Sequence, residues 1–284
     1  MLIFGGGWLG RAIGAEAVRR GGVVAATSRD ADTRQALKAQ GLTAIDPADA
    51  AAQDAALATA DAVVITAPPT AEGCPGHAAL APLLTAERRR PGWIGYVSST
   101  AVYGDRAGGW AFEDDALNAA TLQGARRVRA EQDWLETGRT LGLAVHLFRL
   151  PALYGPGRSG LDRLRNGEAR MVRKPGQVFN RIHADDVVSG LFASMDRPNP
   201  GRAYNLVDDE PAPAHVVTAW SARRLGLPLP PEVDWTDPSV SEGMRRFYLD
   251  SKRVSNARAK AELGWRPKYP SYREGIEALI AQQT

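Results

Sequence analysis

Short apolar runs and longer amphipathic segments alternate along the first half of the chain. The apolar runs are typical of buried parallel strands, and they occupy residues 1–4, 23–27, 43–45, 62–66, 93–99 and 143–150. Alanine-rich segments with helical periodicity lie between them, at residues 9–20, 31–40, 48–60, 76–90 and 119–141. This alternation predicts βαβ units, and therefore an α/β fold with a Rossmann-like, doubly wound parallel sheet.

The alternation becomes less regular after Pro151, where glycine and proline interrupt residues 151–182. Beyond them the pattern predicts helices over 186–195, 214–225 and 251–263 and a strand over 204–209. We therefore expect a dinucleotide-binding domain over 1–150. Residues 151–284 should form mainly a small C-terminal α/β substrate lobe, interleaved with late Rossmann elements at about 182–209.

The sequence GGGWLG, residues 5–10, fits the pattern G-x-G-x-x-G between the first strand and the first helix. Gly5 permits a tight turn, Gly7 lets the main chain approach a pyrophosphate, and Gly10 lets the helix pack closely on the strand. The backbone N–H of Trp8 and the helix dipole favour the negative charge of phosphates. The motif predicts dinucleotide binding, and the alternative is a glycine-rich turn without a ligand.

The end of the second predicted strand indicates which dinucleotide is bound. An acidic residue there would bind the ribose 2′-hydroxyl of NAD, but the chain has Thr27, Ser28 and Arg29. A guanidinium and a hydroxyl suit the 2′-phosphate of NADP better, so NADP(H) is favoured over NAD(H). The alternative, a solvated Arg29 with no ligand, stays open because Asp30 follows it.

Composition limits the classes of partner and the cellular compartment that we expect for the protein. There are 35 Lys and Arg against 32 Asp and Glu, and the arginines are scattered, so nucleic-acid binding is not expected. A single cysteine, Cys74, fits a reducing cytoplasm and excludes an internal disulfide. A strand at residue 1 leaves no room for a signal peptide, and no apolar run approaches the ~20 residues of a membrane span. We expect a cytoplasmic monomer or homodimer without a metal site.

Five further segments resemble a known family in their order along the chain, the last of which is SKRVSNARAKAELGWRPKYPSYREGI (251–276). With the glycine motif and Ala67-Pro68-Pro69, they are similar to the atypical, extended short-chain dehydrogenase/reductase superfamily of NAD(P)-dependent epimerases and dehydratases. The first four are YVSSTAVYGD (96–105), FRLPALYGPGRS (148–159), RIHADDVV (181–188) and AYNLVDDEP (203–211). The resemblance covers nearly the whole chain and implies an NAD(P) cofactor and a small-molecule substrate.

The resemblance also implies roles for individual residues. Ser99 falls where the family keeps a Ser or Thr that hydrogen-bonds the reacting oxygen, although residues 98–100 could instead be a polar strand end satisfied by the backbone. The implied cofactor-binding residues are Gly5, Gly7, Trp8, Leu9 and Gly10, then Ser28 and Arg29, then Ala67 and Pro68 beside the adenosine, and Pro151 beside the nicotinamide.

The chain departs from the family on the helix after Ser99. The family uses a tyrosine four residues before a lysine, and alignment through Glu131 places Gln123 and Arg127 there. Glutamine has no proton to lose near neutral pH, while arginine can donate to ribose oxygens but does not titrate. Two replacements stay open: Tyr103 or Tyr154 in the reacting position, or a proton carried by substrate and water.

A second departure concerns the substrate. Relatives that act on nucleotide sugars have an arginine four residues before the histidine of the RIHADD segment, and Phe179 stands there instead. Arg170, Arg173 or Lys174 are the candidates to replace it, so an anionic substrate remains compatible with the chain.

The leading hypothesis is an NAD(P)-binding oxidoreductase or epimerase-like enzyme that acts on a small polar or sugar-derived substrate. Ser99 would polarise the reacting oxygen, Arg127 would hold the ribose, and Gln123 would occupy the position of the missing tyrosine. The alternative is a non-catalytic NADP(H)-binding sensor or regulatory protein.

Overall fold

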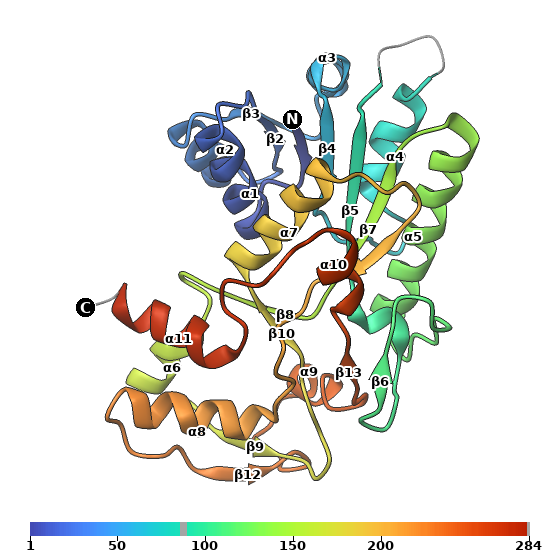
Figure 1. Cartoon of the computed structure of the whole chain (residues 1–284). Coiled ribbons are helices and arrows are strands. Elements are labelled where there is room, and N and C mark those ends of the chain that lie inside the picture. Colours follow the sequence, from blue (N-terminus) through green and yellow to red (C-terminus); the bar gives the residue numbers. More distant parts are fainter. Residues whose placement is uncertain (86–89, 283–284) are drawn as a thin grey trace. The chain divides into compact units, whose positions relative to one another are not determined.

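A computed structural model describes residues 1–85 and 90–282 of the chain (Figure 1). These residues form two compact units, each assembled from separate segments of the sequence. Unit 1 contains Met1–Ser99, Leu122–Arg149 and Val188–Tyr204, and unit 2 contains Thr100–Thr121, Leu150–Val187 and Asn205–Thr284. The split at residue 150 into a cofactor domain and a substrate lobe stays a prediction.

A seven-stranded sheet is the centre of unit 1, with the strand order β11 (Ala203–Asn205), β7 (Val145–Leu150), β5 (Trp93–Ser99), β4 (Ala62–Ile65), β1 (Leu2–Phe4), β2 (Ala25–Thr27), β3 (Thr43–Ile45). The neighbours from β5 to β3 pair in parallel. The chain winds outward from β1 through β2 and β3, then returns to β4 on the other side. Ligands bind at such a reversal in open parallel sheets, and the predicted doubly wound sheet is confirmed.

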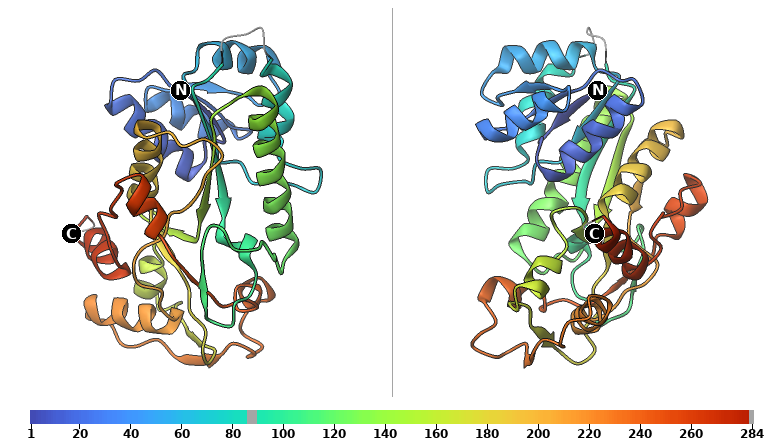
Figure 2. Two further views of the ribbon diagram at one scale, coloured as in Figure 1. Left: turned by 45° about the vertical axis from the view of Figure 1, so that its right-hand side comes forward. Right: turned by 90° about the vertical axis from the view of Figure 1, so that its left-hand side faces the viewer.

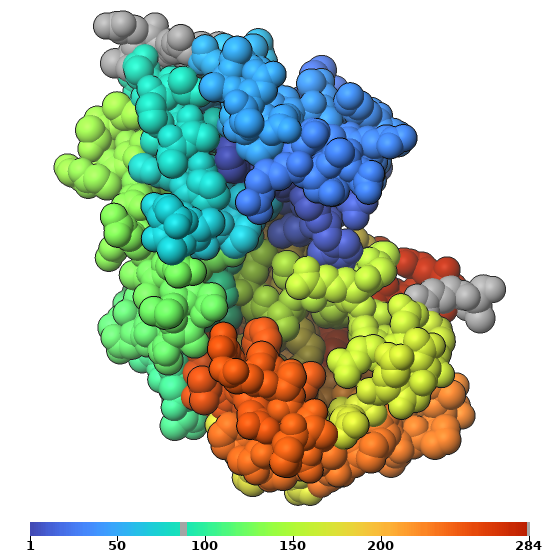
Figure 3. All heavy atoms as spheres, turned by 180° about the vertical axis from the view of Figure 1, so that it is seen from behind, coloured from blue at the N-terminus to red at the C-terminus, as the bar shows by residue number. Residues whose placement is uncertain are grey.

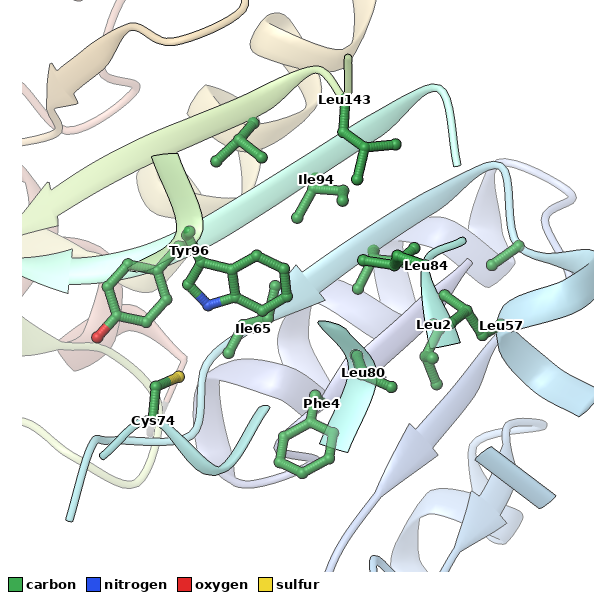
Figure 4. Close-up of a cluster of buried hydrophobic side chains, with 14 of the residues drawn as sticks. Leu2, Phe4, Leu57, Ile65, Cys74, Leu80, Leu84, Ile94, Tyr96 and Leu143 are labelled. Carbon is green, nitrogen blue, oxygen red and sulfur yellow. The ribbon is translucent and has the colours of Figure 1, made fainter. Parts of the chain in front are cut away.

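Helices cover both faces of this sheet (Figure 2). The strand side chains alternate, so Leu2 and Phe4 contribute to one core while Ile3 faces the opposite side. The first core contains residues of α3 (Ala50–Thr59), α4 (Pro75–Leu80) and α5 (Leu122–Leu141), with Trp134 and Tyr96 among its largest members (Figure 4). On the other face, α1 (Trp8–Arg19) ends beside α7 (Ala184–Asp196), where Arg20 lies over the ring of Phe192. The remaining helix of this unit is α2 (Ala31–Ala39).

Unit 2 is built from short elements. Three parallel strand pairs join β8 (Ala152–Tyr154) with β10 (Arg181–His183), β9 (Met171–Arg173) with β12 (Glu232–Asp234), and β6 (Trp110–Ala111) with β13 (Arg253–Val254). The helices are α6 (Leu161–Arg165), α8 (Ala214–Arg224), α9 (Glu242–Arg246), α10 (Ala257–Glu262) and α11 (Tyr272–Ala281). Leucines of α6 and apolar residues of α8 and α11 form a core of this unit.

The sequence patterns were less accurate in the second half of the chain. The predicted helix over 251–263 is wrong at its start, because residues 253–254 form β13 and only 257–262 are helical. The strand expected over 204–209 ends at Asn205, after which the N–H of Asp208 bonds to the carbonyl of Arg181. In unit 1, the helix expected over 76–90 is α4 followed by a 3₁₀ turn over 81–83, and residues 86–89 lie outside the described residues.

None of the helices in the described part of the chain has both the length and the apolar character that a membrane span requires.

Candidate functional site

The turn between β1 and α1 needs glycine at two places for different reasons. Gly5 has φ of +113°, and a Cβ there would lie 2.5 Å from Oγ1 of Thr66. A Cβ on Gly10 would lie only 2.1 Å from the carbonyl oxygen of Gly5. The first glycine therefore makes the turn, and the second lets α1 pack against it, as the motif predicts.

Two threonines fix the shape of this turn. Thr27 accepts a hydrogen bond from the N–H of Gly5 at its Oγ1 (3.0 Å) and one from Gly6 at its carbonyl (2.6 Å). Thr66 donates its hydroxyl to the carbonyl of Gly5 (2.5 Å). Neither threonine was among the predicted site residues, although each follows or ends a buried strand beside β1.

A cavity of about 330 Å³ opens above the turn. A Cβ added to Gly7 would meet nothing within 4 Å, so this glycine faces open space and leaves its main chain accessible. Gly7 is also the N-cap of α1, which has no side-chain cap and no acidic residue in its first turn. These are the features that favour a phosphate at a helix N-terminus. The cavity is lined by Phe4, Gly5, Gly7, Thr27, Ser28, Arg29, Pro47, Thr66, Ala67, Pro68, Thr70 and Pro75.

Arg29, just after β2, gives this cavity a positive charge. No carboxylate occurs among its lining residues, and the exposed Arg29 side chain has no hydrogen bond or ion pair within the described residues. The neighbouring Asp30 is the N-cap of α2 and accepts the N–H of Thr33 (2.7 Å). Hydrogen bonding to Thr33 holds the pKa of Asp30 below its usual value, so this carboxylate is committed to the helix.

Most of the predicted cofactor-binding residues come together here. Gly5, Gly7, Ser28, Arg29, Ala67 and Pro68 all line the one cavity. Trp8 begins α1, while Leu9 and Gly10 are buried behind the turn. Pro151 belongs to unit 2, where it precedes β8.

The residues at the carboxyl end of β5 hold helix α5 in place. Arg127, in the second turn of α5, donates Nη1 to the carbonyl of Val97 (2.5 Å) and to the hydroxyl of Tyr96 (3.3 Å). Burial raises the pKa of Tyr96 well above its ordinary value, so this phenol stays protonated. The guanidinium therefore lies near the end of β5, bonded to Val97, which is two residues before Ser99 in sequence.

A buried ion pair forms a second link between α5 and the sheet. Ser98 donates to Oε1 of Glu131 (2.5 Å), and Arg149 on β7 binds the same carboxylate through Nη2 (2.8 Å) and Nε (3.1 Å). All three residues are at most 5% exposed. Ser98 therefore has a structural role, and Ser99, the last residue of β5, is the half-buried hydroxyl beside it.

Gln123 is exposed in the first turn of α5, one helical turn before Arg127. Its amide has no hydrogen bond within the described part of the chain. An amide there can donate or accept a hydrogen bond but cannot exchange a proton near neutral pH.

The tyrosines considered as replacements are buried in unit 2. Tyr103 is fully buried and donates its hydroxyl to Oδ1 of Asn205 (2.7 Å). The hydroxyl of Tyr154 is buried against Gly275 of α11, and burial raises the pKa of this phenol well above its usual range. Both hydroxyls are therefore buried in this conformation.

Comparison with known proteins agrees with this geometry. The sequence profile of the NAD dependent epimerase/dehydratase family matches residues 1–207. The chain belongs to this family. Protein YeeZ of Escherichia coli is 32% identical over 285 residues, which cover 95% of this chain and 96% of YeeZ.

Two further similarities bear on this epimerase/dehydratase family member. The structure of a functionally unknown conserved protein from Silicibacter pomeroyi is 41% identical, covers 99% of this chain and 98% of its own, and superposes with a TM-score of 0.92. A 3-diazoavenalumate denitrifying reductase from a Streptomyces species is 32% identical over 160 residues, which cover 54% of this chain and 52% of the reductase. The resemblance to the epimerase/dehydratase family is confirmed.

Proposed function

We propose that this protein is an NADP(H)-dependent oxidoreductase acting on a small polar substrate, in which no tyrosine delivers the product proton. The observation that carries the choice of cofactor is the cavity above the glycine turn. It ends at Ser28 and an unpaired Arg29 and has no lining carboxylate within the described residues. A guanidinium in that position matches the geometry and charge of a 2′-phosphate.

NADPH, when bound, supplies a hydride, and the residues of the chain would hold and orient the reactants. Gly5 and Gly7 would seat the pyrophosphate at the start of α1, and Ala67 and Pro68 would contact the adenosine. Arg127 bonds to the strand through Nη1 alone, so its Nε and Nη2 remain for the ribose. Ser99 would donate a hydrogen bond to the substrate.

The absence of a tyrosine restricts the chemistry. Reduction of a carbonyl creates an alkoxide that needs a proton, and Gln123 cannot provide one. The Streptomyces relative is a reductase named for removing nitrogen from a diazo compound. Hydride delivery to the carbon of an arenediazonium ion releases N₂ and forms a C–H bond, so no oxyanion needs to be protonated. We propose a reaction of this kind, or one in which substrate and water carry the proton.

Fluorescence titration with NADPH and NADH tests the cofactor proposal. Arg29→Ala should weaken NADPH binding about 10- to 100-fold, the range expected for a lost charge-assisted hydrogen bond, and leave NADH binding unchanged. Arg19→Ala, which removes an arginine from the other end of α1, is the matched control. Equal affinity of the parent protein for both coenzymes, or no binding of either, contradicts the proposal.

The exposed Gln123 favours one alternative, a non-catalytic NADP(H) sensor. NADPH absorbance should be followed with arenediazonium ions, carbonyl compounds and nucleotide sugars as candidate substrates. Turnover that is lost in Ser99→Ala supports the oxidoreductase. Tight NADPH binding with no oxidation by any of these compounds, together with a partner affinity that differs between NADP⁺ and NADPH, supports the sensor.

A further inference from the structure

Unit 2 contains a cavity of its own, of about 360 Å³. It is bounded by α6, β9, α8 and the segment around α9, and one residue of α11 completes its wall. The segments that contain α6 and α9 both reach the face of the molecule drawn in Figure 3. Its lining residues are Ser159, Gly160, Arg163, Leu164, Ala169, Arg170, Val172, Val217, Thr218, Ser221, Ser239, Val240, Ser241, Met244 and Ile276.

The charged residues of this lining are all positive. Arg163 and Arg170 contribute guanidinium groups, and no lining residue within the described part of the chain is acidic. Arg163 donates only to the carbonyl of Glu168 (3.4 Å), and Arg170 donates Nη1 to the hydroxyl of Ser239 (2.8 Å). Neither forms an ion pair with a described residue. Asp237 lies behind Ser239 and accepts its hydroxyl (2.6 Å), so it offsets part of the charge of Arg170 from outside the cavity.

Two hydroxyls add hydrogen-bond donors. Ser159 accepts the N–H of Leu161 (3.3 Å), and Ser241 accepts the N–H of Met244 (3.2 Å). Each oxygen is thereby used as an acceptor, and its proton has no acceptor within the described residues. The polar groups of the cavity that remain for a ligand are therefore mainly donors, which is the set that an anion requires.

Part of the wall is apolar and buried. Leu164, Val172, Val240 and Ile276 are each less than 10% exposed. Met244 adds a flexible, polarisable side chain from α9. A ligand that filled this space would place a hydrophobic body against the wall and its polar group at the arginines.

We propose that this cavity binds a small organic anion, a carboxylate or a phosphate monoester carried on an apolar body. The size supports a compact ligand, because about 360 Å³ is near the lower end of small-molecule sites, roughly 300–1,000 Å³. The cavity contains Arg170, one of the residues expected to hold an anionic substrate, so the proposal rests on the proposed function for its link to substrate. Binding there requires no cofactor, so a failure of anion binding is distinguishable from a failure of coenzyme binding.

Calorimetric titration of the full chain with benzoate and phenyl phosphate tests the proposal and distinguishes the two anion types. Benzyl alcohol has the apolar body without the charge, and inorganic phosphate has the charge without the apolar body. One or both aromatic anions should bind at least tenfold more tightly than either control ligand. Arg163→Gln/Arg170→Gln should weaken that binding at least tenfold. Arg139→Gln/Arg197→Gln, a charge-matched pair in unit 1, should leave it unchanged.

Met244→Trp fills the cavity from α9 and provides a second variant that keeps both arginines. Its thermal midpoint should match that of the parent protein, while binding of the aromatic anion is lost. The proposal is overturned if benzyl alcohol or inorganic phosphate binds as tightly as the aromatic anions. It is equally overturned if neither anion binds, or if folded Arg163→Gln/Arg170→Gln and Met244→Trp bind them like the parent.

Discussion

The glycine turn after β1 and the first turns of α5 belong to the same unit but use their polar groups in different ways. At the turn, Thr27 and Thr66 hold the backbone from behind, Gly7 faces open space, and the side chain of Arg29 lines the cavity without a hydrogen bond or ion pair within the described residues. At α5, Arg127 bonds to the strand, and Gln123, which we expect in place of the family tyrosine, is exposed. The comparison supports our proposal that the dinucleotide-binding turn is kept while the group that moves the proton is replaced.

The largest expected effect concerns the anchor of α5. Glu131→Gln leaves Arg149 buried without a counter-charge, and removing one partner of a buried ion pair costs about 3–5 kcal/mol. Urea unfolding should show this loss in the free energy of unfolding. Glu136→Gln, which breaks an exposed pair on the same helix, is the control and should change little. Equal effects of the two variants would mean that the buried pair does not anchor the helix.

Acid should destabilise the sheet that carries both regions. His146 is fully buried, accepts the N–H of Asn199 at Nε2 (2.9 Å), and burial lowers its pKa from 6.5 to about 4. The unfolded chain takes up this proton first, so stability is present above pH 6.5 and falls as the pH drops toward 4, by about 3 kcal/mol. Unfolding measured across this range should show a shallower loss in His146→Gln than in His215→Gln, the control. Cofactor binding and turnover should therefore be compared above pH 6.5.

Introducing the tyrosine and lysine of the family tests whether this pair is the only part of the reductase site that the chain lacks. Gln123→Tyr/Arg127→Lys should raise carbonyl reduction about 100-fold, the lower range for general acid catalysis, measured by loss of NADPH absorbance. Gln123→Phe/Arg127→Lys adds the same ring without the hydroxyl and should gain nothing. A gain in both variants would assign the effect to the ring or the lysine, and no gain in either would mean that the site differs in more than this pair.

The smallest effects separate the two roles of the glycines. Gly10→Ala places a methyl group against the carbonyl of Gly5 and should lower the free energy of unfolding by about 1–3 kcal/mol. Gly7→Ala adds a methyl group to open space, so the unfolding free energy should change by less than about 1 kcal/mol while NADPH binding weakens. Thermal unfolding and NADPH titration of both variants measure this difference, and the reverse result would exchange the roles of the two residues.

The sequence predicted the parts of the molecule that local patterns determine. The strands of the sheet are short apolar runs between amphipathic helices, so β1 to β5 and β7 could be placed from the pattern of apolar and polar residues alone. The residues from 251 onward could not, because SKRV has no strand periodicity. It becomes β13 because Arg253 and Val254 pair with Trp110 and Ala111, far away in sequence. Two-residue strands of this kind depend on tertiary contacts that no local pattern contains.

The same limit applies to the site. The glycine motif and the polar end of β2 could be identified as site candidates from their residue types alone. Six of the predicted residues line one cavity. Thr27 and Thr66 could not be identified in this way, because their role comes from hydrogen bonds to a turn elsewhere in the chain. The inward direction of Arg127 could not be inferred either, because an arginine on a half-exposed helix can point to solvent, to the strand or to a ligand.

The position of Asp30 links coenzyme choice to the start of a helix. Arg29 faces the cavity, while the carboxylate next to it accepts the N–H of Thr33 and begins α2. An exchange of these two residues would bring an acid to the ribose, but it would also leave α2 with an arginine as its N-cap. Under the proposed preference for NADP(H), a change to NAD(H) by this route would therefore also require a new N-cap for α2.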